Sequence, residues 1–354
     1  MHERLEQAFA NYVGTKYAVA VNTGGMALQM CKRAIGVKPG DEVIHQVDTC
    51  VANAFAAVNA FAIPRFSDID LGTFMPGRQE LEACITGKTK ALIPIHIWGN
   101  AMDMDMVRDI ANKHQLTIIE DGCLALGAKW KQENVGSMGH VGVFSFGCLK
   151  PIQAGEGGMI TTNDEALAKE LRTIRSYGDT SWEYNVRDNR TLSWNGRISE
   201  IVAAVAFEQL LGYPEFLRRL TENVAEFKKW LETIDGLSIQ EGSYQNAYTQ
   251  VVLKLEPLVM SKNDLKQAME QVGINVWHAN FEPITSLSFF RTDEWRTWLP
   301  ETSHESVAKN FGGQFPNAWK LYNEVGLGIG RQHFISKANV RDLIKKMGNV
   351  LLKS

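Results

Sequence analysis

The stretch Tyr17–Leu28, YAVAVNTGGMAL, contains a short apolar strand, a turn of small residues and the start of a helix. A strand that leads through a tight turn into a helix is the first half of a βαβ unit, from which parallel sheets are built. Further short apolar or β-branched runs follow it. The pattern predicts seven strands, at Tyr17–Val21, Glu42–His45, Ile63–Phe66, Ala91–His96, Thr117–Asp121, Val141–Phe146 and Gly158–Thr162.

Helical periodicity lies between most of these strands. Several of the strands are apolar throughout, as a sheet covered by helices on both faces requires. We therefore predict an α/β domain with a mostly parallel, seven-stranded sheet. Its helices are expected near Met26–Ala34, Val51–Ala60, Met104–His114 and Glu165–Ser176.

The second half of the chain departs from this alternation. Residues 177–197 are polar and rich in aromatic residues, and a loop of this length is usually functional or interfacial. A boundary near Gly212-Tyr213-Pro214 is expected to divide a large domain, 1–212, from a small α+β domain, 213–354. The expected elements are helices at Ile198–Leu211, Glu215–Leu231, Lys262–Gln271 and Ala338–Leu352, and strands at Thr249–Leu255 and Asn275–His278.

Composition and charge limit the classes of function. A chain of 354 residues, 45% hydrophobic and 22% charged, can bury more than one small core and is unlike a disordered chain. Its formal net charge of −3 provides no basic stripe for a phosphate backbone. We expect no nucleic-acid partner.

The cysteines and the apolar segments bear on location. Five cysteines form no CxxC pair and no closely spaced framework, which is typical of a reducing cytoplasm. The N-terminus lacks the pattern of a signal peptide. The longest apolar stretch, Cys50–Ile63, is interrupted by Asn53 and Asn59 and is too short to cross a bilayer. We expect a cytoplasmic protein with no membrane partner and no metal site.

Lys150 follows the strand at Val141–Phe146 and precedes the glycine-rich run Gly155–Gly158. A lysine just past a buried strand is poorly solvated, which favours the neutral amine that a Schiff base requires. Ser145, at the end of the same strand, could donate a hydrogen bond to a phosphate. The alternative is a surface lysine beside an ordinary glycine turn.

Asp121 ends an apolar strand, at the sheet edge where α/β proteins bind ligands. A carboxylate there can pair with a protonated pyridine nitrogen and so keep the ring able to accept electrons. The alternative is a cap for the turn that follows.

The turn Thr23-Gly24-Gly25-Met26 offers backbone N–H groups at a helix N-terminus, which suit a phosphate. Similar glycine-rich turns are frequent in α/β proteins that bind no phosphate. The turn alone therefore does not establish a phosphate site.

Together, in this order and at these spacings, the motifs resemble the sugar aminotransferases of the DegT/DnrJ/EryC1/StrS family, which depend on pyridoxal phosphate and have fold type I. The resemblance covers nearly the whole chain and is fainter beyond Pro214. It is carried by residues 17–28, 40–44, 66–70, 94–99, 119–128, 141–164 and 194–204, and then by Phe281-Glu282-Pro283, Phe315-Pro316 and the C-terminal helix.

The resemblance implies a role for each matching residue. Lys150 would be the Schiff-base lysine and the proton carrier of the reaction, and Asp121 would pair with the pyridine nitrogen. Gly25 and Met26, through backbone N–H groups, and Ser145, through its hydroxyl, would hold the phosphate.

Asn195 matches an asparagine that reaches the phosphate from a second subunit. The resemblance therefore implies a homodimer with a shared active site. From the residues alone, Asn195 could instead belong to the cap of the helix that begins near Ile198.

Three departures from the family pattern bear on the cofactor and the substrate. Cys50 stands where most members stack an aromatic residue on the pyridine ring. Leu124 stands where many have a glutamine or histidine near the phenolic oxygen. The chain also begins at a helix, Leu5–Tyr12, without the N-terminal arm that helps to shape the acceptor pocket in most members.

The resemblance implies transfer of an amino group from glutamate or glutamine, through pyridoxamine phosphate, to the ketone of a sugar, nucleotide-linked or free, or of a cyclitol. A ping-pong cycle is expected. One alternative, a sugar dehydratase, would have histidine in place of Lys150. The other, an inactive regulatory relative, would have lost Lys150 or Asp121. Both residues are present.

Two residues are candidates for substrate contacts. Arg331, after a glycine-rich strand, could bind the carboxylate of the amino donor, or it could be a surface or salt-bridging arginine. His96 is more typical of a packed, hydrogen-bonded residue at a strand end than of a catalyst.

Overall fold

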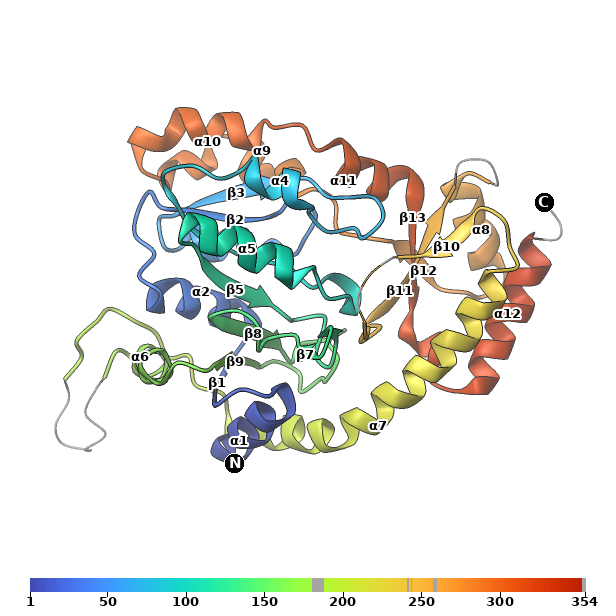
Figure 1. Cartoon of the computed structure of the whole chain (residues 1–354), viewed down its shortest axis with the longest axis horizontal. Coiled ribbons are helices and arrows are strands. Elements are labelled where there is room, and N and C mark those ends of the chain that lie inside the picture. The colour runs from blue at the N-terminus through green and yellow to red at the C-terminus, as the bar shows by residue number, and fades with distance from the viewer. Residues whose placement is uncertain (180–187, 241, 243, 257–259, 352–354) are drawn as a thin grey trace.

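The computed structural model describes residues 1–179, 188–240, 242, 244–256 and 260–351. A seven-stranded sheet with the order β1-β9-β8-β5-β4-β2-β3 forms the centre of the large body (Figure 1). β9 runs antiparallel to both of its neighbours, and the other neighbouring pairs are parallel. The predicted mostly parallel sheet is confirmed. Its strands are β1 (Tyr17–Val21), β2 (Glu42–Gln46), β3 (Ile63–Ser67), β4 (Thr89–Leu92), β5 (Thr117–Asp121), β8 (Val141–Ser145) and β9 (Gly158–Thr162).

Helices cover both faces of this sheet. Right-handed crossovers place α2 and α3 on one face and α4 and α5 on the other, because the two pairs connect strands in opposite directions across the sheet. α6 packs beside α2, and α1 packs against β1 and α7. The bounds are α1 (His2–Val13), α2 (Gly24–Ala34), α3 (Ala52–Val58), α4 (Arg78–Glu82), α5 (Met104–His114) and α6 (Glu165–Arg175), with a hairpin of β6 (Lys129–Trp130) and β7 (Glu133–Asn134).

The strand predicted at Ala91–His96 is found earlier in the chain, at Thr89–Leu92. Pro94 has no N–H to donate to a neighbouring strand, which interrupts the ladder. The segment stays beside β5 all the same. Asp121 donates its N–H to the Pro94 carbonyl at 2.9 Å, and His96 donates to the Asp121 carbonyl at 3.1 Å.

The two helices predicted around Pro214 are one helix, α7 (Glu200–Leu231), so the predicted break is wrong. Proline costs a helix one hydrogen bond and some steric strain. Burial of Leu210, Tyr213 and Leu217 on one side of α7 offsets that cost, and the Tyr213 hydroxyl donates to the Leu126 carbonyl at 2.7 Å. α7 therefore runs unbroken from the large body to the small one (Figure 1).

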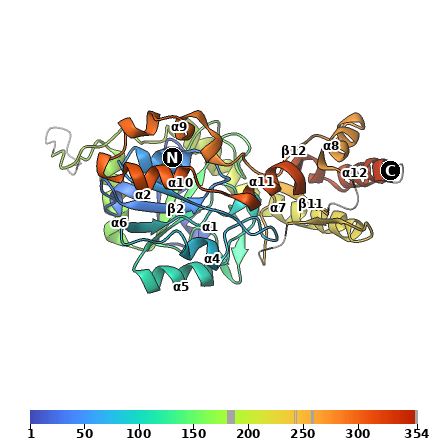
Figure 2. The same ribbon diagram turned by 90° about the horizontal axis from the view of Figure 1, so that it is seen from above.

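The small body has a four-stranded sheet, in the order β10-β11-β13-β12. Two strands were not predicted. β10 is short, and three of the five residues of β13 are glycine, which has low strand propensity. α8 and α12 lie beyond this sheet at the far end of α7 (Figures 1 and 2). The elements are β10 (Leu237–Ile239), β11 (Gln250–Leu255), α8 (Lys262–Gln271), β12 (Val276–His278), β13 (Gly326–Gly330) and α12 (Lys337–Leu351); predicted residue Leu352 lies outside the described residues.

Two apolar clusters form the cores. α7 contributes Leu217 to the first and Leu220 to the second, while residues 279–321 pack with the first cluster although they follow α7 in sequence. The division at residue 212 stays a prediction.

Among the described residues, no helix is long and apolar enough to span a bilayer. Residues 279–321 include α9 (Ser288–Arg291), α10 (His304–Phe311) and α11 (Pro316–Lys320).

Candidate active site

The end of β8 and the start of α2 meet at the carboxyl edge of the large sheet. A Cβ built on Gly24 would lie 2.7 Å from the Ser145 Cβ, and one built on Gly158 would lie 2.9 Å from the Gly24 nitrogen. Both distances are too short for any side chain. Glycine at these positions is therefore what allows the α2 N-terminus to lie against Ser145.

The α2 N-terminus is capped by Thr23, whose side chain accepts from the Met26 N–H at 2.9 Å. The predicted phosphate contact of Met26 therefore competes with this cap. The N–H groups of Gly24 and Gly25 precede the first possible intrahelical bond and point out of the helix end. The phosphate roles of Gly25, Met26 and Ser145 stay predictions.

Asp121 is buried at the end of β5 with both carboxylate oxygens engaged. The Asn53 side-chain amide donates to Oδ2 at 2.7 Å, and the Cys123 N–H donates to Oδ1 at 3.0 Å. Asp121 thus caps the turn that follows, as the structural alternative requires, and is held in one orientation. Sequence reasoning missed the role of Asn53, whose one signal was a polar residue within an apolar helix.

Lys150, Asp121 and Cys50 all act electrostatically on the thiol of Cys123. Burial raises the pKa of that thiol well above its ordinary value, the Asp121 and Cys50 groups raise it further, and Lys150 lowers it. Asp121 pairs with Val143 in the parallel ladder of β5 and β8, so Asp121 and the end of β8 that leads to Lys150 lie at the same edge of the sheet. The predicted lysine and aspartate therefore share one site, and Cys50 lies on its exposed side.

The loop that carries Lys150 is held by Arg331. The guanidinium donates to the Lys150 carbonyl at 2.8 Å and to the Pro151 carbonyl at 3.3 Å. Leu149, immediately before Lys150, is exposed and has a φ of 64°. A left-handed non-glycine residue stores strain, which is frequent at functional sites. The structure gives Arg331 a positioning role, and its contact with a donor carboxylate stays a prediction.

His96 is fully buried and both ring nitrogens are engaged. Nε2 pairs with the Glu120 carboxylate at 3.1 Å, and Nδ1 accepts from the Met102 N–H at 3.1 Å. This arrangement favours the packed alternative over a substrate contact.

Leu124 is nearly buried, and its carbonyl accepts from the Thr249 hydroxyl. An aliphatic side chain has no group that can bond to a phenolic oxygen. Leu124 therefore cannot replace the glutamine or histidine that many family members have at this position.

Asn195 lies beside β1. Its carbonyl accepts from the Asn22 side chain at 3.1 Å, and its own Oδ1 accepts from the Arg197 N–H at 3.3 Å. A bridge between Val21 and Arg197 fastens the end of this loop to the edge of the sheet. The cross-subunit role of Asn195 stays a prediction, and residues 180–187 of the loop lie outside the described residues.

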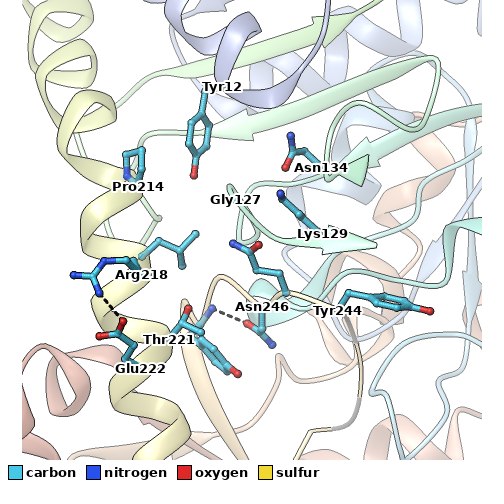
Figure 3. Close-up of a pocket in the computed structure, with 13 residues that line it drawn as sticks. Tyr12, Gly127, Lys129, Asn134, Pro214, Arg218, Thr221, Glu222, Tyr244 and Asn246 are labelled. Carbon is cyan, nitrogen blue, oxygen red and sulfur yellow. Dashed lines mark hydrogen bonds and ion pairs between the residues drawn. The ribbon is translucent and has the colours of Figure 1, made fainter. Parts of the chain in front are cut away.

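A cavity of about 640 Å³ lies elsewhere, between α1, α7 and the β6-β7 hairpin (Figure 3). Tyr12, Lys129 and Thr221 are among its lining residues. None of the sequence-predicted site residues lines it. The size of a cavity therefore does not locate the site, whereas the grouping of lysine, aspartate and glycines does. No group of three metal-binding side chains occurs in the part of the chain that the structure describes.

These residues fit a phosphorylated pyridine cofactor. The glycines provide a close backbone approach at a helix N-terminus, Asp121 provides a fixed carboxylate, and Lys150 provides an amine at the same site. Together with the mostly parallel sheet, they define a pyridoxal-phosphate enzyme of fold type I.

A model of the DegT/DnrJ/EryC1/StrS aminotransferase family matches residues 1–311, and the chain belongs to that family. The protein is accordingly a pyridoxal-phosphate-dependent aminotransferase. It is 41% identical over 214 residues to GDP-perosamine synthase of Caulobacter vibrioides, a match to 60% of this chain and 57% of that protein. It is 30% identical to spore coat polysaccharide biosynthesis protein SpsC of Bacillus subtilis, over 99% of this chain and 89% of that one. The solved aminotransferase of Psychrobacter cryohalolentis superposes with a TM-score of 0.88 at 26% identity and covers 99% of this chain and 91% of its own.

Proposed function

We propose that the protein transfers an amino group from glutamate or glutamine to the ketone of a sugar, nucleotide-linked or free, or of a cyclitol. The observation that carries this proposal is the buried, doubly hydrogen-bonded Asp121 in the same site as Lys150. The name of the Caulobacter relative supports a sugar as the acceptor.

Pyridoxal phosphate, when bound, would supply an electron-accepting ring that carries the amino group between donor and acceptor. Lys150 would hold the cofactor through its Nζ and would move a proton at the carbon that bears the amino group. Asp121 would pair with the ring nitrogen. Ser145 and the first N–H groups of α2 would hold the phosphate, and Arg331 keeps the Lys150 loop in place.

Borohydride reduction of the cofactor-loaded protein, followed by peptide mapping, tests the central assignment. The label is expected on Lys150, and Lys150→Ala should take up none while it keeps the wild-type fold by circular dichroism. Label on another lysine would contradict the assignment. Addition of candidate donors one at a time, with the visible absorbance of the cofactor recorded, identifies the donor by the loss of absorbance it causes.

We further infer a homodimer in the cytoplasm. The support for a dimer is Asn195 on a loop fastened to the edge strand β1, beside the phosphate-binding turn. The support for a reducing compartment is that all five cysteines are free. Sedimentation is expected to give a dimer, and an active monomer that retains the cofactor would contradict the role of Asn195.

A further inference from the structure

A second cavity, of about 410 Å³, lies between α1, the beginning of β1 and α6. α1 and α6 both pack against β1, which is the edge strand of the large sheet (Figure 1). The turn that is predicted to hold the cofactor phosphate follows the other end of β1, so this cavity is separate from the candidate active site. Three cationic side chains, Lys16, Arg172 and Arg175, are among the residues that line it.

Part of this lining has a structural role at the sheet edge. β1 has no neighbouring strand on its outer side, so its outward backbone groups need other partners. The Glu6 carboxylate accepts from the Ala20 N–H at 2.9 Å. Arg172 donates to the Ala18 carbonyl at 3.3 Å, and Arg175 donates to the Ala20 carbonyl at 3.1 Å. These bonds explain why polar side chains lie here, but they use only one nitrogen of each guanidinium.

The charges of the cluster do not balance. One carboxylate, that of Glu6, pairs with both guanidiniums, at 2.7 Å from Arg175 and 3.5 Å from Arg172. Arg175 is 6% exposed and Glu6 is 9% exposed, so water screens this pair poorly. Arginine keeps its charge inside proteins, and a buried charge is costly unless it is paired. Two guanidiniums on one glutamate therefore leave a surplus positive charge beside the cavity.

The cluster also has spare hydrogen-bond donors. The Nε of Arg175 is buried and has no partner in the described structure. Among the described residues Arg172 donates through Nη2, which leaves its Nε and Nη1 available. Lys16 adds an exposed cation to the same cavity, and Glu3, on the exposed face of α1, adds a second carboxylate. Spare N–H groups combined with surplus positive charge are what an anion requires.

We propose that this cavity binds a small molecule through its phosphate group, which lies against Arg172 and Arg175 with Lys16 on its outer side. Guanidinium forks match a phosphate and bind it through paired, charge-assisted hydrogen bonds. The cavity has room for more than a phosphate, and Glu3 and Gln7 on α1 can accept hydrogen bonds from hydroxyl groups. Free phosphate and a phosphorylated sugar share this chemistry.

Titration calorimetry with inorganic phosphate and with glucose 1-phosphate tests the proposal. The protein is first loaded with pyridoxal phosphate and reduced with borohydride, so that the cofactor's own phosphate blocks the active site against both probes. At pH 7.5, with the ionic strength held constant by chloride, we expect saturable binding at one site per chain. Glucose without a phosphate should not bind.

Substitutions locate the site. Arg172→Gln should weaken binding of the phosphate by roughly tenfold or more, because a charged fork is lost. Lys16→Gln should weaken it less, because solvent screens an exposed charge. Lys16 is exposed, so this second variant tests the site even if Arg172→Gln fails to fold. Lys169→Gln is the matched control, since Lys169 is an exposed lysine of α6 that pairs with Glu165 and lies outside the cavity lining. It should bind both probes as the wild type does.

Each outcome decides the proposal. Absence of saturable binding of both probes to the wild type would overturn it. Equal affinity in the wild type, Arg172→Gln and Lys16→Gln would show an adventitious ion only and would overturn it as well. With binding that depends on these residues, tighter binding of glucose 1-phosphate assigns a phosphorylated sugar, and equal or weaker binding assigns free phosphate.

The proposed function is tested separately. If the protein fails to take up pyridoxal phosphate, the proposed function fails, but the comparison of the variants still reports on the cavity because Lys16 and Arg172 lie away from the phosphate-binding turn. If the cofactor is taken up and the variants bind both probes as the wild type does, only the anion site fails.

Discussion

The adjacent carboxylates of β5 face opposite sides of the sheet and meet opposite conditions. On one side, Glu120 accepts from the N–H groups of Gly136, Met138 and Gly139 and pairs with His96, whose other nitrogen is also engaged. On the other side, Asp121 accepts two hydrogen bonds but lies near polar atoms that have no partner in the described structure.

The difference separates a structural network from a responsive one. A buried polar network in which every group is satisfied rigidifies the fold, and any change in it leaves groups unpaired. A network with spare donors and acceptors can accept a ligand or change its protonation at lower cost. Burial and a carboxylate are common to both sides, so completeness of the hydrogen bonding is what distinguishes them.

The largest expected effect comes from a substitution in the fully hydrogen-bonded network around Glu120. Glu120→Gln replaces one acceptor oxygen with an NH₂ group, which leaves buried N–H groups of Gly136, Met138 or Gly139 facing another donor. The free energy of unfolding should fall by roughly 3 kcal/mol. Urea denaturation measures this loss. An unchanged midpoint would show that the network relaxes, and the comparison between the two sides would then fail.

On the Asp121 side of the sheet, the unpaired polar groups should make the free energy of unfolding depend on pH. In the unfolded chain Lys32 of α2 keeps its ordinary pKa of 10.5, whereas burial in the folded protein lowers the pKa of this lysine to about 8. Between these values the unfolded state binds more protons, so the free energy of unfolding rises with pH. Below pH 8 both states hold the proton and the dependence ends. The rise should total about 3 kcal/mol in the cofactor-free protein.

Lys32→Met should abolish that rise, and Lys38→Met, at an exposed lysine just after α2, should retain it. Denaturation of all three proteins at pH 7, 8, 9 and 10 provides the measurement. A variant with the wild-type profile would assign the pH dependence to another group.

Asp121→Asn tests the same side through chemistry. Asparagine has nearly the same shape but no charge to face the ring nitrogen. The rate of the donor half-reaction should fall roughly 10²-fold or more. Stability should change little, because the asparagine oxygen still caps the turn and the Asn53 amide, whose Oδ1 has no partner in the described structure, can flip to accept from the new NH₂ group. Stopped-flow absorbance with glutamate or glutamine measures the rate.

Asp164→Asn is the matched control for this substitution, because Asp164 caps α6 through its side chain and does nothing else in the described site. It should leave the rate unchanged. Equal rates for Asp121→Asn and wild type would reduce Asp121 to the same capping role.

The smallest effect is expected at Arg331, which fastens the Lys150 loop from the small body. Arg331→Gln should lower the free energy of unfolding by about 2 kcal/mol, because two hydrogen bonds to the loop are lost and each is typically worth about 1 kcal/mol net. Proteolysis between Ser145 and Gly158 should become faster, and borohydride labelling of Lys150 slower. A normal loop with impaired donor binding would instead support the predicted carboxylate contact.

The sequence alone determined the large sheet. Its strands are short apolar runs, as a sheet buried on both faces requires, and its helices have apolar residues at helical spacing. It also indicated Asp121 and Lys150, since a carboxylate and a lysine just past apolar strands fall at the ligand edge of any such sheet. The resemblance to a family then gave these residues roles that spacing could not.

Only the tertiary structure decided the rest. The helix α7 continues through Pro214 because side chains distant in sequence bury its inner side, and β13 pairs in spite of its glycines because β11 and β12 flank it. Lys32 is the clearest case. In the sequence it is a basic residue in the last turn of a helix, where a cation is favoured by the helix dipole and usually solvated. Only the packing of α3, α6 and the sheet strands β8 and β9 against α2 removes water from this lysine, and no local pattern encodes that burial.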